Sequence, residues 1–224
     1  MNTSTETEIK NLLKDVVQLF QEKKKSKKIS ARVQRGRASS IANEFEDRFA
    51  TLLEKALPYK YSIFVDYPLS YKVEGRKRYK TSYPDVAIIR DSSVLVGIIE
   101  LKIDLGYLPR GWADKTKAEF EHLCKAEKIR YKTDIGTDKA MVKELSVARE
   151  LHKATVVLTG KNDHRRLLGF SKQENCFVLS RNIHPNDYAI NDSNKIHFVE
   201  KIISDPDNIK SWRKFAEFLN DNFE

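Results

Sequence analysis

Apolar residues recur along this chain with two different periods, and the periods predict which segments are helices and which are strands. In residues 8–23 and again in residues 39–57, apolar side chains return every three or four positions, as on a helix with one buried face. Pro58 ends the second helix. The same spacing predicts a helix over residues 137–152 and a last helix that begins near Asn208.

Short apolar runs predict the strands. They occupy residues 61–72, 86–89, 94–99, 154–159, 177–179 and 196–199. A short turn at Asp91-Ser92-Ser93 makes 86–89 and 94–99 an antiparallel pair, and the unbroken apolar run 94–99 indicates a central strand covered on both faces. A helix between strands 94–99 and 154–159 suggests a right-handed crossover. The predicted fold class is therefore α/β, a mixed sheet flanked by helices.

Charged residues stand where two of these strands begin and end. Asp85 precedes the run 86–89, and Glu100 and Lys102 follow the run 94–99. Because side chains alternate along a strand, Glu100 and Lys102 share one face while Leu101 points to the other, and Asp85 on the partner strand lies near them. Two carboxylates in a partly buried site repel each other unless a cation lies between them. Mg²⁺ prefers such oxygen ligands, and the Leu101 carbonyl is a further candidate ligand. The alternative is an ordinary ion pair at a strand end.

At Pro84, Asp85, Glu100 and Lys102 the sequence resembles the PD-(D/E)xK nuclease superfamily, which has a restriction-endonuclease-like fold. The resemblance implies a Mg²⁺-dependent nuclease, with Mn²⁺ as a substitute metal. Asp85 and Glu100 would bind the metal, and Lys102 would assist the attacking water. In outline the resemblance covers residues 39–160. It also implies an acidic residue on the first core helix, where Glu46 lies at the edge of the apolar stripe; the alternative for Glu46 is a solvated helix carboxylate.

Length and charge set the wider limits. A chain of 224 residues is long enough for one good core. We expect a nuclease domain over residues 39–224, with its core at 39–160 and a C-terminal elaboration at 161–224, preceded by an amphipathic helix and basic arm in residues 1–38. With 41 basic and 32 acidic side chains the net charge is +9, which favours a polyanionic partner. Two cysteines, a polar start and no long apolar run predict a cytoplasmic protein with no membrane association.

The basic residues concentrate in two segments. Residues 23–37 contain eight basic and no acidic side chains, among them Lys24, Lys27, Arg35 and Arg37, and they form a candidate phosphate-tracking arm. A solvated linker is the alternative. A second segment, with Arg76, Lys77 and Arg78, is the candidate tip of a hairpin that reaches a nucleic-acid groove. After the site, Trp112 and its basic neighbours are either a channel lining or a packed loop.

These observations predict a Mg²⁺-dependent endonuclease that cuts DNA, of the type II restriction or phage-defence kind. Two alternatives stay open: an RNA endonuclease with the same metal site, and a non-catalytic nucleic-acid-binding module. The helix at residues 8–23 packs on its own domain or forms a homodimer, and a dimer would suit matched cleavage of two strands.

Overall fold

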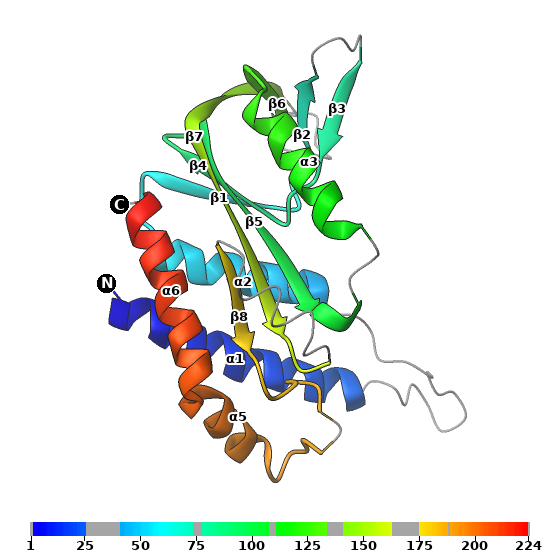
Figure 1. Ribbon diagram of the computed structural model, residues 1–224, viewed down its shortest axis with the longest axis vertical. Coiled ribbons are helices and arrows are strands. Elements are labelled where there is room, and N and C mark those ends of the chain that lie inside the picture. The colour runs from blue at the N-terminus through cyan, green and yellow to red at the C-terminus, as the bar shows by residue number, and fades with distance from the viewer. Residues whose placement is uncertain are drawn as a thin grey trace, which may run out of the picture.

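An eight-stranded sheet with mostly antiparallel pairing forms the centre of the molecule (Figure 1). The computed structural model describes residues 2–25, 41–73, 78–107, 111–133, 141–162, 175–187 and 189–223. The helices are α1 (Asn2–Lys25), α2 (Ala42–Ala56), the 3-10 turn η1 (Leu105–Tyr107), α3 (Trp112–Cys124), α5 (Lys195–Ser204) and α6 (Pro206–Phe223). The strands are β1 (Tyr61–Val65), β2 (Leu69–Lys72), β3 (Tyr79–Ser82), β4 (Val86–Arg90), β5 (Val94–Asp104), β6 (Lys128–Thr133), β7 (Met141–Thr159) and β8 (Cys176–Ser180).

The strand order is β1-β4-β5-β7-β6-β2-β3, and β8 also pairs with β7. The predicted antiparallel pairing of β4 with β5 is confirmed, and β5 runs parallel to β7 along its whole length. The long strand β7 pairs with β6 through its first part and with β8 through its last part. β5 is thus a central strand, as its unbroken apolar run predicts.

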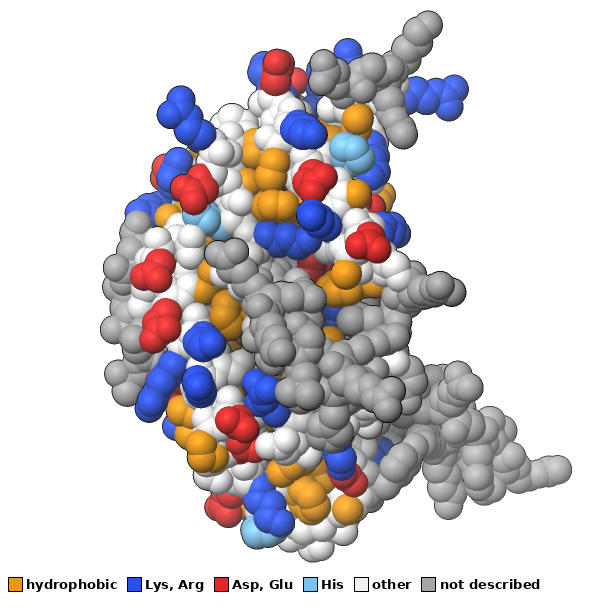
Figure 2. All heavy atoms as spheres, in the orientation of Figure 1, with side chains coloured by type: hydrophobic (Ala, Val, Ile, Leu, Met, Phe, Trp, Pro, Cys, Tyr) orange, Lys and Arg blue, Asp and Glu red, His pale blue; other side chains and the backbone are white. Residues whose placement is uncertain are grey.

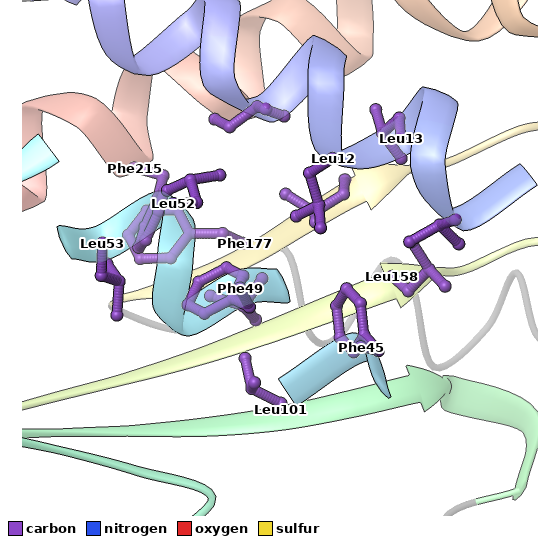
Figure 3. Packing of buried hydrophobic residues seen from close by; sticks show 14 of the residues in the cluster. Leu12, Leu13, Phe45, Phe49, Leu52, Leu53, Leu101, Leu158, Phe177 and Phe215 are labelled. Atoms are coloured by element: carbon purple, nitrogen blue, oxygen red, sulfur yellow. The ribbon is translucent and has the colours of Figure 1, made fainter. Parts of the chain in front are cut away.

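Helices cover the two faces of the sheet unequally. The larger apolar cluster lies under α1, α2, α5 and α6, where Phe45 and Phe49 of α2 pack between α1 and the strand residues Leu101, Leu158 and Phe177 (Figure 3). The smaller cluster lies on the other face, where Leu123 of α3 packs near strands β2, β4, β5 and β6. The chain is a single α/β domain. Its larger apolar cluster contains residues of α1 and of the C-terminal helices together with residues from the predicted core at 39–160.

Two predicted elements are wrong. Residues 137–152 were expected to be helical because Met141, Leu145 and Ala148 recur at helical spacing, but residues from Met141 onward belong to β7. Pairing of β7 with β5 and β6 outweighs this local periodicity, and Met141 is exposed. Residues 196–199 were expected to be a strand, but they lie in α5, where Val199 and Ile202 share one buried face.

Two further boundaries differ from the sequence prediction. The single strand expected over residues 61–72 is two strands, because the chain turns at Asp66, whose φ is 45°, and continues through Pro68. Helix α3 and strand β6 occupy the stretch after the site where the sequence predicted neither. Within the described ranges, no helix is both long and apolar enough to cross a membrane.

Candidate active site

The site forms just before β4 begins, where β5 continues past the first residue of β4. The last pair between these strands joins Val86 to Ile99, so the next amide of β5 that faces β4, Leu101 N–H, has no strand partner there. The Asp85 carboxylate takes that place: its Oδ2 accepts a hydrogen bond from Leu101 N at 2.6 Å. The backbone of β5 thereby fixes the position of the Asp85 carboxylate beside Glu100 and Lys102.

The Lys102 ammonium lies beside both carboxylates, as the alternation of side chains along β5 predicts. Its Nζ lies 2.7 Å from Asp85 Oδ2 and 3.4 Å from Glu100 Oε2. The three side chains are about one-fifth exposed, at 21% for Asp85, 17% for Glu100 and 21% for Lys102. The structure therefore brings together the three residues that the motif singles out, in a site that is shielded from solvent but still open to it.

The charges in this site are unbalanced. Burial, and after it the charge of Asp85, raise the pKa of the Glu100 carboxyl. Burial opposes the positive charge of Lys102, yet the charge of Asp85 and its hydrogen bond keep the Lys102 pKa above its usual value. The Lys102 ammonium is thus the single positive charge beside two carboxylates. The partly buried carboxylates of Asp85 and Glu100 therefore favour a further positive charge near them.

Glu46 adds a third carboxyl to this neighbourhood. It projects from α2, and burial raises its pKa to about 7, with further contributions from the charges of Asp85 and Asp66. The sequence predicts Glu46 at the edge of the apolar stripe of α2, and the influence of the Asp85 charge on the Glu46 pKa agrees with that prediction. Asp66, at the end of β1, was not predicted from the sequence, because its nearness depends on how β1 lies beside β4.

The donor set suits a Mg²⁺ ion held by few protein ligands. Among the residues that the structure describes, no group of three or more His, Cys, Asp or Glu side chains lies in metal-binding geometry. Asp85 and Glu100, however, both approach one cationic atom, Lys102 Nζ, and so can approach a metal ion from the same side. Mg²⁺ commonly takes one or two carboxylates and completes its shell with water and phosphate oxygens, and Asp85 and Glu100 match that number of protein ligands. The side chain of Leu101 packs in the core on the other face, which leaves only its backbone carbonyl as a ligand.

A second polar cluster follows two residues farther along β5. Asp104 is buried, and its Oδ2 lies 3.1 Å from Nε2 of His184, while Gly106 N donates to Oδ1 at 2.7 Å. Nδ1 of His184 accepts a hydrogen bond from Asn186 N, so the neutral ring donates from Nε2 to Asp104. Both ring nitrogens are occupied in this way, which gives His184 a structural role, and burial lowers its pKa.

Most of the predicted phosphate-binding residues lie outside the described residues, namely Lys27, Arg35, Arg37, Arg76 and Lys77. Lys24 is described, but its Nζ donates to the carbonyl oxygens of Asp187 at 2.7 Å and Ile190 at 3.4 Å, so it anchors the end of α1. Arg78 is exposed just before β3, at the end of the antiparallel β2–β3 pair. In Figure 2 basic and acidic side chains are mixed over the described part of the visible face.

Comparisons with protein-family models, with curated proteins and with solved structures find no match to this chain.

Proposed function

We propose that this chain is a Mg²⁺-dependent endonuclease of the PD-(D/E)xK type, with a restriction-endonuclease-like fold, and that it hydrolyses phosphodiester bonds of DNA. The observation that supports this proposal most directly is the convergence of Asp85, Glu100 and Lys102 at the point where β4 begins to pair with β5. Glu100 and Lys102 come from β5 and Asp85 from the residue before β4, whereas a strand-end ion pair needs only two of these residues. The net charge of +9 agrees with a polyanionic substrate.

Each residue has a distinct role in the proposed reaction. Asp85 and Glu100 hold the metal, and the Leu101 amide keeps the Asp85 carboxylate oriented. Lys102 places a positive charge next to the reacting phosphate, where negative charge develops. Glu46, whose pKa is raised to about 7 by burial and by the charge of Asp85, is the candidate to exchange a proton with water at the site. A bound Mg²⁺ supplies Lewis-acid stabilisation of the phosphoryl oxygen and lowers the pKa of water.

The test is cleavage of defined DNA by purified protein with Mg²⁺, with Mn²⁺ and with a chelator. We expect cleavage only with a divalent metal. The variants Asp85→Asn, Glu100→Gln and Lys102→Met should each lower the rate by on the order of 10² or more, the scale of losing one preorganised electrostatic group. Glu127→Gln, which changes an exposed carboxylate away from the site, is the matched control.

Full activity in all three variants would contradict the site assignment. A panel of duplex DNA, single-stranded DNA and RNA separates a DNA nuclease from an RNA nuclease. A calorimetric titration with Mn²⁺ in the presence of uncleaved substrate separates both from a non-catalytic binding module, for which we expect no heat of metal binding.

A further inference from the structure

Three adjacent strands place side chains in a row that leads away from the site. Glu100 of β5 is in register with Thr155 of β7, and Thr155 is in register with Cys176 of β8. Residues in register on neighbouring strands face the same side, and two strand spacings amount to about 10 Å. The face that presents Glu100 therefore continues across β7 to the start of β8.

A groove of about 410 Å³ lies along this row, between α3 and the beginning of β8. Its lining includes Trp112, Asp114, Thr116 and Lys117 of α3 together with Lys153, Thr155 and Cys176 of the sheet. The Trp112 ring closes the end next to the site, since its centroid lies 5.6 Å from Lys102 Nζ. Burial raises the pKa of Cys176 to about 11, so its thiol stays neutral, and Lys117 and Lys153 outnumber the one carboxylate of the lining, Asp114.

Lys153 is the basic residue deepest in this groove. It is half-buried, and its Nζ lies 5.3 Å from the centroid of the Phe120 ring. Within the part of the chain that the structure describes, no carboxylate lies within ion-pair distance of this ammonium, and its strongest charge interaction is with Glu100. An ammonium that is partly desolvated and has no paired anion is a favourable contact for a phosphate group.

We propose that this groove holds the nucleotide next to the scissile phosphate, with Trp112 stacked on its base and Lys153 in contact with its phosphate. The inference rests on the proposed nuclease function and adds the form of the substrate. The groove has the size of a pocket for one small ligand, roughly 300–1,000 Å³. A base inside a duplex cannot enter such a pocket without leaving its stack, whereas a base in a single strand is free to do so. The substrate is therefore single-stranded at the cleavage position.

The two tryptophans make this inference directly measurable. Trp212 is fully buried, and its Nε1 donates to Leu179 O at 2.9 Å, so a ligand that changes tryptophan emission acts on Trp112. We expect a single-stranded DNA 10-mer, with Ca²⁺ in place of Mg²⁺, to quench emission of the wild-type protein. Trp112→Phe, whose emission comes from Trp212 alone, should show no quenching. An RNA 10-mer of the same sequence is tested in parallel. Tighter binding of the RNA would support a groove for single strands but assign the substrate to RNA.

Affinity of a fluorescein-labelled 10-mer, measured by anisotropy, tests each contact. Trp112→Ala should weaken Kd about tenfold, within the range for losing one base stacked on an aromatic ring, and Trp112→Phe should retain most of the affinity. Lys153→Met should weaken Kd and lower the slope of log Kd against log salt by about 0.7, the value for one phosphate contact on a single strand. Lys143→Met is the matched control, because Lys143 is exposed near the opposite end of the same strand.

Equal quenching by a blunt duplex of the same sequence would overturn the single-strand assignment. An unchanged salt slope in Lys153→Met, with the variant folded by circular dichroism, would overturn the phosphate contact. Because none of these measurements requires cleavage, quenching without any nuclease activity would contradict the proposed function and leave the binding groove intact.

Discussion

The pKa of Glu46 depends on the burial of its carboxyl group and on the charges around it. Glu46 lies on α2 near Asp85 and Asp66, and burial together with these charges raises its pKa to about 7. An unfolded chain would ionise the same group near pH 4.3. Between these two values the folded protein binds a proton that the unfolded chain has released, so this group makes folding less favourable as the pH rises from about 4 to 7.

Glu46→Gln removes this ionisation. At pH 8 we expect the variant to be more stable than wild type, by on the order of 1 kcal/mol once solvent screening of a half-exposed carboxylate is included. At pH 4, where both side chains are neutral, the two proteins should be equally stable. Thermal unfolding in the presence of a chelator checks this, and Glu54→Gln, on the exposed face of the same helix, is the control. A stability difference that does not change with pH would contradict the assignment.

At the scale of elements, the sequence predicts how the three site residues lie better than it predicts the strands of the whole sheet. The positions of Asp85, Glu100 and Lys102 follow from strand alternation and one short turn, and both are local properties. The nature of β7 is not local: its apolar residues fit a helix almost as well, and only its pairing with β5 and β6 makes it a strand. Lys153 could not be identified in advance for the same reason, because its nearness to Glu100 depends on the register between β5 and β7.

Gly97 decides how closely α6 approaches β5. A Cβ atom at Gly97 would lie 2.7 Å from Cζ and 2.9 Å from Cε1 of Phe223. The Phe223 ring is buried and packs edge-on against Tyr61 and His152, so it has little room to move. The absence of a side chain at Gly97 is thus part of the contact between the last turn of α6 and the central strand.

We expect Gly97→Ala to destabilise the protein by about 1–3 kcal/mol, the usual range for overpacking a core. Chemical denaturation gives this value as a shift of the unfolding midpoint with an unchanged slope. In a Phe223→Leu background, where the clashing ring is absent, the same substitution should cost less. Equal costs in the two backgrounds would show that the ring does not limit the position.

At the scale of the whole molecule, the first helix belongs to the main core. Leu13 and Val16 of α1 are fully buried, and α1 packs against α2, α5 and α6. Its apolar face is therefore covered by its own chain, as the packing alternative expects, and a homodimer would have to use another surface. The predicted boundary at residue 38 lies outside the described residues.

Leu13→Ala tests whether α1 and the sheet unfold together. We expect a loss of about 2–5 kcal/mol, the range for a large-to-small change in a core, and a single unfolding transition. Lys14→Ala, at the exposed neighbouring position, should change stability little. A separate early transition in Leu13→Ala, with the main midpoint unchanged, would mean that α1 is an independent arm.

Leu101 belongs to the site and to the core at once. Its amide orients Asp85, while its side chain lies beneath α2 in the larger apolar cluster (Figure 3). A substitution that repacks the interior at this position would shift the backbone that aligns the carboxylate. During evolution the interior near Leu101 and the position of the Asp85 carboxylate would have to change together. The groove beside α3 has no such tie to the interior at Leu101, so under the proposed function its substitutions would alter the choice of strand without disturbing the carboxylate.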